Sequence, residues 1–161
     1  MKRIGIKARS DDHIFDYSLI EDNIFVGSDL CKGKQCPIHS KEFNEIGVNV
    51  EINLKAESRE IPPENIDSYI WIPVVDEYAP TQNQMDLGTS IIKQAVDNRQ
   101  VVYVHCEEGQ GRSPTLIAAY LIRYKNYNVE DAIRYLKERR PEVDIGKRQR
   151  KALDRYFQKW K

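Results

Sequence analysis

Three residues in one short stretch combine a nucleophile with groups that bind anions. Cys106 carries a thiol, Arg112 follows six positions later, and Ser113 comes next. A thiolate is a strong nucleophile, and the guanidinium fork of arginine holds two phosphate oxygens at once, which lysine does not. A nearby hydroxyl can donate a hydrogen bond to the thiolate, which matters most when the sulfur must leave again. The combination predicts attack of sulfur on the phosphorus of a bound phosphate ester.

The surrounding sequence predicts a buried strand, a loop with glycines and then a helix. Residues 101–104 (VVYV) are apolar without alternation, as in a strand buried on both faces. Pro114 suits the first turn of a helix over residues 115–126, and the free amides and dipole there favour an anion and a thiolate. Glycines let the loop backbone close around an oxyanion. The expected oxyanion-binding residues are Glu107, Glu108, Gly109, Gln110, Gly111 and Arg112.

The pattern His105-Cys106-x-x-Gly109-x-x-Arg112-Ser113 resembles the signature of the protein tyrosine phosphatase superfamily, and of its short dual-specificity-type branch in particular. The resemblance implies a phospho-cysteine intermediate and requires no metal or other cofactor. It gives His105 a supporting role in holding the loop and the thiolate. Rhodanese-like and Cdc25-like domains also carry a cysteine loop that ends in arginine, but Gly109 argues against them. A structural cysteine with arginine and glycine downstream by chance is the remaining alternative.

A second chemical group is expected in residues 73–80 (PVVDEYAP). The leaving oxygen of a phosphate ester needs a proton, and a carboxylic acid above the cleft can supply it, worth about 10²–10⁴ in rate. Asp76 stands before Pro80, at the general-acid position of the IPxxDxxxP pattern in the resembled family. Glu77 is the alternative acid. Asp76 could instead cap the following helix, although Asn83 could also do so.

The last expected helix, residues 147–160, has apolar residues at helical spacing that suit the core. Gln149 in its first turn resembles the glutamine that positions water in many members of the family. The alternative is an exposed helix residue. The basic run over residues 147–151 (KRQRK) is interpreted as a solvated helix face.

The remaining pattern predicts the α/β class, with a central, mostly parallel sheet of about four to five strands flanked by helices. This is the cysteine-phosphatase fold that the resemblance implies. A single domain over residues 1–161 is expected, with residues 1–20 forming an N-terminal arm or a short helix around residues 13–19. The expected strands are 24–26, 48–54, 69–72 and 101–104, and the expected helices are 40–46, 85–96, 115–126, 129–136 and 147–160.

Composition narrows the classes of partner. The chain has 161 residues, with 25 Lys and Arg against 25 Asp and Glu, so it offers no global basic field for nucleic acid or an anionic membrane. No apolar run reaches the ~18 residues that span a bilayer, and the N-terminus lacks the apolar core of a signal peptide. Three cysteines give no disulfide framework, and a nucleophilic thiol suits a reducing compartment. A cytoplasmic monomer that binds neither nucleic acid nor membrane is expected.

Two further cysteines flank a polar loop, residues 31–37 (CKGKQCP). A variable surface loop near the cleft is the favoured interpretation. A reversible disulfide between Cys31 and Cys36 is one alternative. Zinc bound by Cys31, Cys36 and His39 is another, but the sequence shows no fourth ligand at a suitable spacing. No metal is therefore expected.

The expected activity is hydrolysis of phosphomonoesters on proteins, at phosphotyrosine and also at phosphoserine and phosphothreonine. The chain is short and shows no obvious tyrosine-recognition loop, which favours dual specificity. Glu107 and Glu108 would repel a multiply charged inositol head group or an RNA 5′-triphosphate, unless their side chains point away. The alternatives are a phosphatase on RNA 5′-triphosphate, phosphoinositide or phosphoglycan, and a phospho-binding regulator. Phosphate, vanadate or sulfate should occupy the loop.

Overall fold

The computed structural model describes residues 16–29, 31 and 36–161. Its sheet has the strand order β1-β2-β5-β3-β4, in which only the pair β1–β2 is antiparallel. The predicted α/β class with a mostly parallel sheet is therefore confirmed. The elements are β1 (Tyr17–Glu21), β2 (Ile24–Gly27), α1 (Pro37–Ile46), β3 (Val48–Lys55), β4 (Ser68–Val74), α2 (Gln82–Asp97), β5 (Val101–His105), α3 (Arg112–Lys125), α4 (Val129–Arg139) and α5 (Lys147–Trp160).

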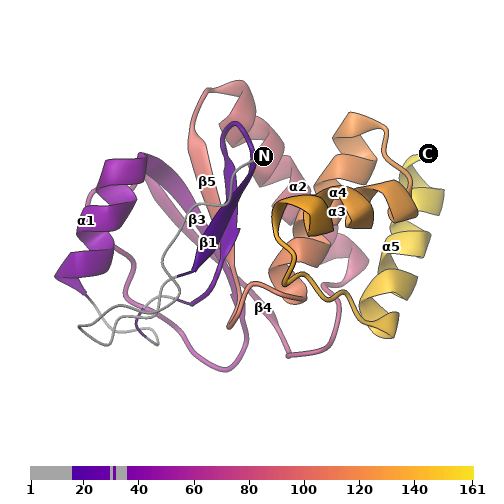
Figure 1. The fold of residues 1–161 in the computed structure, drawn as a ribbon, viewed down its shortest axis with the longest axis horizontal. Helices are drawn as coiled ribbons and strands as arrows, with labels where there is room; N and C mark the ends of the chain where they lie inside the picture. Colours follow the sequence, from indigo (N-terminus) through magenta and orange to yellow (C-terminus); the bar gives the residue numbers. More distant parts are fainter. Residues whose placement is uncertain (1–15, 30, 32–35) are drawn as a thin grey trace.

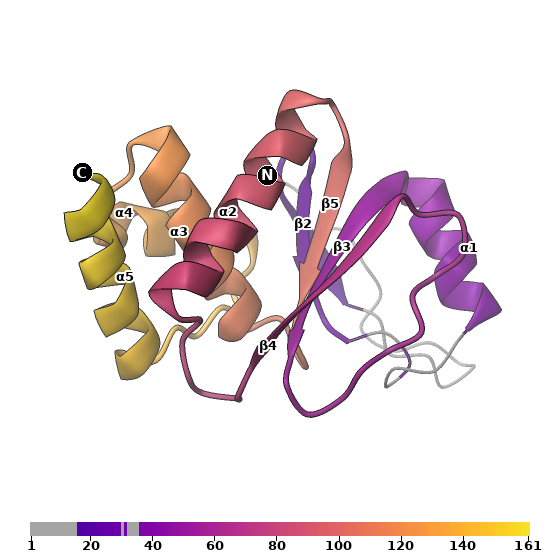
Figure 2. The same cartoon turned by 180° about the vertical axis from the view of Figure 1, so that it is seen from behind.

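Helices cover both faces of the sheet. Helix α1 lies on one face and α2 to α5 lie on the other, as Figures 1 and 2 show from opposite sides. On the α1 face, the ring of Phe43 packs 4.8 Å from that of Tyr103. On the other face, residues 112–122 of α3 are all buried, and they form the centre of the larger apolar core. The helix that follows the glycine-bearing loop is thus held on several sides.

Strand β5 has neighbours on both edges, β2 and β3, and three of its five side chains belong to the apolar core. This placement explains its uninterrupted apolar sequence, because a parallel strand in the middle of a sheet is covered on both faces. It also fixes the position of the loop that follows.

Strand β1 corrects one prediction. Residues 17–19 form part of a strand and not of the helix expected around residues 13–19, and residues 13–15 lie outside the described residues. β1 pairs with β2 so that Tyr17 lies opposite Gly27, and its ring contacts Phe25 at 5.6 Å. These cross-strand contacts decide the local structure, since strand preference depends on neighbours more than on the segment itself.

The start of α2 excludes one role considered for Asp76. Thr81 is the N-cap: its side chain accepts a hydrogen bond from the Gln84 amide at 3.1 Å, and the Gln84 side chain accepts one from the Thr81 amide at 2.9 Å. This capping box leaves no capping function for Asp76 or Asn83. Asp76 is therefore available for another role.

Candidate active site

Four loops meet at one edge of the sheet, where the parallel strands β2, β3, β4 and β5 end. The register pairs His105 with both Gly27 and Asn53, and Lys55 with Val74, so these strands finish at nearly the same level. The edge lies at the lower side of the sheet in Figure 1. Ligands of open α/β sheets bind at the carboxyl ends of the strands. The loop from β5 to α3, residues 106–111, is called the phosphate loop below.

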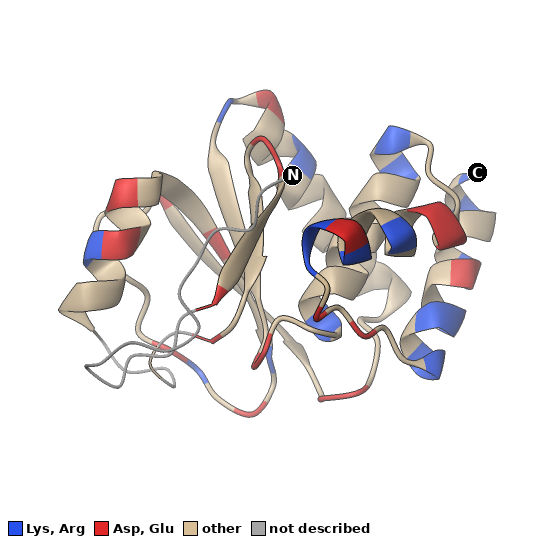
Figure 3. Cartoon of the chain, in the orientation of Figure 1, with Lys and Arg blue, Asp and Glu red and all other residues tan. Residues whose placement is uncertain are grey.

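A cavity of about 470 Å³ opens at this edge. It brings together Cys106, Arg112, Asp76 and Gln149, which come from three separate stretches of the sequence. Acidic positions on the loops and basic positions at the start of α5 lie at this end of the molecule (Figure 3). The lining residues are Asp76, Glu77, Cys106, Glu107, Glu108, Gln110, Gly111, Arg112, Asp144, Gly146, Lys147, Arg148 and Gln149.

Arg140 shapes the phosphate loop from behind. Its side chain is fully buried and donates from Nη2 to the carbonyl of Glu108 and from Nε to the carbonyl of Gly109, both at 2.9 Å. Its Nη1 donates to Ser18 Oγ at 3.1 Å. Gly109 has φ +70°, and a Cβ there would lie 2.6 Å from the Gly27 carbonyl oxygen. The loop can close this tightly only with glycine at that position.

The loop carbonyls on either side of these two, those of Glu107 and Gln110, also accept hydrogen bonds from residues outside the loop. The Asp29 amide donates to the Glu107 carbonyl at 2.8 Å, and the Asp144 amide donates to the Gln110 carbonyl at 2.7 Å. In a planar trans peptide the C=O and the following N–H point in opposite directions. Carbonyls fixed outward therefore turn the amides of residues 108–111 toward the cavity. This gives the loop the inward donors that an oxyanion requires.

The nucleophile candidate lies at the foot of this loop. Cys106 is buried, and its Sγ lies 3.2 Å from Ser113 Oγ in the first turn of α3. The hydroxyl is thus placed to donate a hydrogen bond to an ionised sulfur. Thr115 closes the turn by donating from its amide and its hydroxyl to the Gly111 carbonyl, at 3.0 and 2.7 Å.

Arg112 is held by a carboxylate that sequence reasoning did not find. Glu57 accepts two parallel hydrogen bonds, from Nη1 at 2.6 Å and from Nη2 at 2.9 Å, and the Val74 carbonyl accepts from Nη1 at 2.8 Å. Hydrogen bonding to Arg112 lowers the pKa of Glu57 to about 2, against the opposing effect of burial. Nε of Arg112 is buried and has no hydrogen-bond partner among the described residues. This donor remains for an oxyanion in the cavity.

Asp76 lies at the rim of the cavity. Its side chain is 72% exposed, and its Oδ1 lies 3.5 Å from Arg112 Nη2. The same oxygen accepts a hydrogen bond from the Glu77 amide at 2.9 Å, and Glu77 has a left-handed backbone with φ +68°. An exposed carboxyl group beside the arginine can exchange its proton with water and still reach a bound phosphate.

His105 is buried behind the loop among acceptors. Its Nε2 lies 2.7 Å from Glu51 Oε2 and 3.2 Å from Glu60 Oε1, and its Nδ1 lies 3.3 Å from the Cys106 carbonyl oxygen. Both ring nitrogens face oxygen atoms, an arrangement that favours the protonated ring. Burial alone would lower the pKa of His105, but the charges of Glu60 and Asp29 and the hydrogen bonds raise it overall.

Replacing Glu60 with glutamine should lower the free energy of unfolding by about 1–3 kcal/mol, because the buried imidazolium loses a charged partner. The pKa of His105 is higher in the folded protein than in the unfolded chain, so protonation of the ring stabilises the fold. This contribution is fully present below the unfolded pKa of about 6.5 and is lost as pH rises through the folded pKa. The destabilisation should therefore be largest in acid and should shrink as pH rises. Urea unfolding between about pH 5.5 and 8.5 measures it.

Glu138→Gln is the matched control for this experiment, since Glu138 is 64% exposed on α4. Its effect should stay within about 0.5 kcal/mol at every pH. A Glu60→Gln destabilisation that is the same at all pH values would contradict a protonated His105.

Lys55 ties the phosphate loop to the end of β2. The residue is buried, and its Nζ lies 2.7 Å from Asp29 Oδ2 and 2.5 Å from Glu107 Oε2. Burial acts to lower the pKa of Lys55, but the two carboxylates raise it overall. Glu107 therefore shares with Asp29 a lysine that the sequence did not associate with the site.

Gln149 is not the exposed helix residue that one interpretation allowed. It is buried, its Oε1 accepts from the Gly146 amide at 2.9 Å, and its Nε2 donates to the Tyr78 carbonyl at 3.2 Å. A Cβ on Gly111 would lie 3.0 Å from Nε2, so the amide packs directly against the phosphate loop. Arg148 stacks over the Tyr78 ring at 4.3 Å, so the basic run also contributes to the cavity wall.

Comparison with known proteins places the chain in a family. The family model described as the catalytic domain of dual specificity phosphatases matches residues 31–159, most of the chain. The chain belongs to the dual specificity phosphatase family. Its homologues include protein phosphatases and lipid phosphatases, so family membership alone does not decide the substrate of this phosphatase.

Rat dual specificity protein phosphatase 5 is 37% identical to the phosphatase over 47% of the chain, and the Arabidopsis thaliana phosphatidylglycerophosphate phosphatase PTPMT1 is 32% identical over 50%. The aligned parts cover only 20% and 24% of those two proteins. A solved structure of PTPMT1 superposes with a TM-score of 0.78 at 24% identity, covering 89% of this chain and 94% of that one. Human DUSP28 superposes with a TM-score of 0.76 at 19% identity, covering 89% and 93%. These structures share the fold.

In the part of the chain that the structure describes, no helix is both long and apolar enough to cross a lipid bilayer.

Proposed function

We propose that this chain hydrolyses phosphomonoesters on proteins, at phosphotyrosine and at phosphoserine or phosphothreonine, through a phospho-cysteine intermediate. One observation carries the proposal: Cys106, the Arg112 fork and the Asp76 carboxylate face one cavity. The loop between the first two has its carbonyls bound from outside, so its amides form the floor. A nucleophile, an oxyanion site and an acid are thereby placed around the same point.

In the first step the Cys106 thiolate attacks phosphorus in line, and the bond from phosphorus to the leaving oxygen breaks. Asp76, protonated, gives its proton to that oxygen. Nε of Arg112 and the loop amides hold the equatorial oxygens of the phosphoryl group. Because these donors are already in position, they stabilise the charge of the transition state without rearranging. The products are a phospho-cysteine and the dephosphorylated alcohol or phenol.

In the second step Asp76, now a carboxylate, takes a proton from a water molecule that attacks the phospho-cysteine. We assign the positioning of this water to Gln149, whose amide packs against Gly111. Cys106 leaves as a thiolate, and the hydroxyl of Ser113 at 3.2 Å stabilises it by donating a hydrogen bond. Inorganic phosphate then departs, and the thiolate is ready for the next substrate.

The charges around the cavity support a substrate with a single phosphoryl group. Five of the described lining residues are acidic and three are basic. Glu107 shares the charge of Lys55 with Asp29, and the carboxylates that line the cavity would repel further phosphates at close range. The acidic lining residues are Asp76, Glu77, Glu107, Glu108 and Asp144, and the basic ones are Arg112, Lys147 and Arg148. Inositol polyphosphates and RNA 5′-triphosphates are therefore poor candidates.

A lipid phosphomonoester is the second candidate, and two of the relatives support it. Two Arabidopsis thaliana phosphatidylglycerophosphate phosphatases, PTPMT1 and PTPMT2, are 32% and 29% identical to the chain over 50% and 71% of its length. Their substrate also presents one terminal phosphomonoester. The charge pattern of the cavity does not separate this substrate from a phosphoprotein.

A substrate panel tests the proposal. Peptides with phosphotyrosine, phosphoserine or phosphothreonine are compared with phosphatidylglycerophosphate and phosphoinositides in vesicles and with triphosphorylated RNA, by phosphate release. We expect the highest kcat/KM on phosphopeptides and inhibition by vanadate. A higher value on phosphatidylglycerophosphate would replace the protein substrate with a lipid. Oxyanion binding without turnover of any ester would indicate a phospho-binding regulator.

Replacing Asp76 with asparagine should lower kcat on a phosphotyrosine peptide by about 10²–10⁴-fold, because the leaving oxygen no longer receives a proton. Steady-state rates of phosphate release from the peptide measure the loss.

Glu77→Gln makes the same chemical change at the adjacent residue, which also lines the cavity. It tests the alternative acid directly. A larger loss of kcat for Glu77→Gln than for Asp76→Asn would assign the proton transfer to Glu77.

A further inference from the structure

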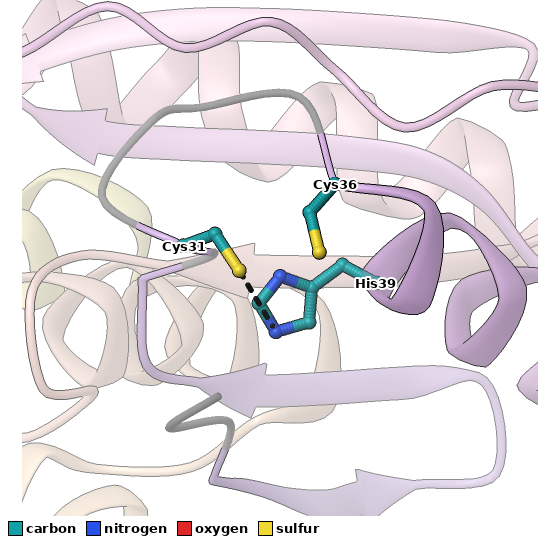
Figure 4. A group of neighbouring side chains, drawn as sticks. All are labelled: Cys31, Cys36 and His39. Carbon is teal, nitrogen blue, oxygen red and sulfur yellow. Dashed lines mark hydrogen bonds between the residues drawn. The ribbon is translucent and has the colours of Figure 1, made fainter. Parts of the chain in front are cut away.

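Three side chains near the start of α1 point toward one another. Cys31 follows β2, Cys36 is the N-cap of α1, and His39 lies in the first turn of that helix (Figure 4). One ligand atom from each residue, the two Sγ atoms and a ring nitrogen, can be chosen so that all three lie within 4.8 Å of one another. His39 is buried, and both cysteines are partly buried. The spacing along the chain left open whether these residues meet, and the fold brings them together.

The distances suit a tetrahedral metal ion. With metal–sulfur bonds of about 2.3 Å and metal–nitrogen bonds of about 2.0–2.1 Å, the donor atoms around zinc lie roughly 3.5–3.8 Å apart. Cys31 Sγ and His39 Nε2 are 3.8 Å apart, and Figure 4 shows the sulfur directed at this nitrogen. Donor atoms up to 4.8 Å apart need to approach by at most about 1.3 Å to reach these separations.

We propose that Cys31, Cys36 and His39 bind a zinc-type divalent ion. Two thiolates and one imidazole form the donor set that zinc takes in proteins, whereas calcium and magnesium take oxygen. Cys36 is the N-cap of a ten-residue helix and His39 lies in its first turn, so α1 holds two of the three donors. Three protein ligands leave the fourth tetrahedral position to water.

The imidazole distinguishes this proposal from a disulfide. A Cys31–Cys36 disulfide would use both sulfurs and leave His39 without a function in the group. A metal ion uses all three donors, including the buried ring. The sequence alone predicts a surface loop without metal, because spacing along the chain does not show that these three side chains meet.

The proposed site is separate from the cavity. None of the three residues is among the described residues that line it. They connect to the phosphate loop through the chain, because Asp29, two positions before Cys31, donates its amide to the Glu107 carbonyl at 2.8 Å. The proposal therefore does not depend on the phosphatase activity.

Cobalt titration of the full chain tests the proposal. The chain is purified without a histidine tag, reduced, stripped with a chelator and titrated with Co²⁺ under anaerobic conditions. We expect one equivalent to bind, with a sulfur-to-cobalt charge-transfer band and the intense visible bands of tetrahedral cobalt. Zn²⁺ should displace the cobalt and abolish these bands. At about 100 times its Kd, Zn²⁺ should also raise Tm by roughly 5–10 °C.

Variants then locate the metal. His39→Asn, Cys31→Ser and Cys36→Ser should each weaken Zn²⁺ binding by at least about tenfold, as loss of one ligand does. Cys106→Ser is the matched control, since it removes the remaining cysteine, and it should leave the stoichiometry and the cobalt spectrum unchanged. If a variant is of low stability, spectra at intermediate cobalt loading still show whether sulfur binds the metal, through the charge-transfer band.

Three outcomes would overturn the proposal. One is a cobalt spectrum without sulfur charge transfer. Another is loss of metal binding in Cys106→Ser, which would place the ion in the cavity. The third is equal Zn²⁺ binding by the wild type and the Cys31→Ser variant, with Cys31 and Cys36 forming a disulfide on mild oxidation.

Discussion

Replacing Cys106 with serine is expected to reduce kcat by at least roughly 10⁴-fold, because a serine hydroxyl stays protonated where a thiol ionises. The rest of the site is unaffected by this change. Arg112 keeps its contacts with Glu57 and Val74, and the loop carbonyls remain bound by Arg140. A phosphopeptide should therefore still bind.

Two measurements on the same variant separate chemistry from binding. Phosphate release reports turnover, and calorimetric titration with a phosphotyrosine peptide reports affinity. We expect turnover to disappear and the Kd for the peptide to remain within about tenfold of the wild-type KM. Turnover that persists in Cys106→Ser would exclude a covalent route through this sulfur.

Replacing Arg112 with lysine is expected to lower kcat/KM by about 10²–10⁴-fold. Lysine keeps the positive charge, but its three N–H donors cannot replace the bonds to Glu57 and to the Val74 carbonyl and still leave one for phosphate. The loss should therefore appear in both KM and kcat. Steady-state kinetics with a phosphotyrosine peptide measure it, with circular dichroism to confirm the fold.

Arg134→Lys is the matched control for this experiment, since Arg134 is 62% exposed on α4 and pairs with Asp131. Its kinetics should equal those of the wild type. A loss of less than about tenfold for Arg112→Lys would mean that positive charge alone suffices, and that the geometry of the fork does not matter.

The sequence was most informative where the chemically important residues lie within a segment of clear local structural preference. Residues 101–114 combine an apolar run, glycines and a helix-compatible segment, and these local preferences agree with the final fold. Asp76 was predicted as the acid from its position after an expected strand and from the IPxxDxxxP pattern of the resembled family. The prediction of about four to five strands with a mostly parallel arrangement rests on the same local signals, and it is confirmed.

The groups that the sequence did not reveal act over long separations. Glu57 bonds Arg112 across 55 positions, and Arg140 bonds the Gly109 carbonyl across 31. No periodicity or motif marks such partners, because charged residues in loops are usually solvated. Their contacts become evident only when the strand ends are brought to one edge.

Local patterns also misled at element boundaries. Helix α1 begins at Pro37, three residues before the predicted start at residue 40, since proline is well suited to an N-terminal position. Residues 17–19 became a strand because β2 was available as a partner. Both differences depend on neighbours that the segment alone does not contain.

The most direct test of the central claim is to trap the phosphoryl group on the enzyme. Asp76→Asn is mixed with p-nitrophenyl phosphate, whose leaving group needs little protonation, so the first step stays fast while activation of water slows. After a rapid acid quench, mass spectrometry of the peptides locates the phosphoryl group. The account predicts a burst of p-nitrophenol and phosphate attached to Cys106. A burst with phosphate on another residue, or turnover without any phosphorylated enzyme, would contradict it.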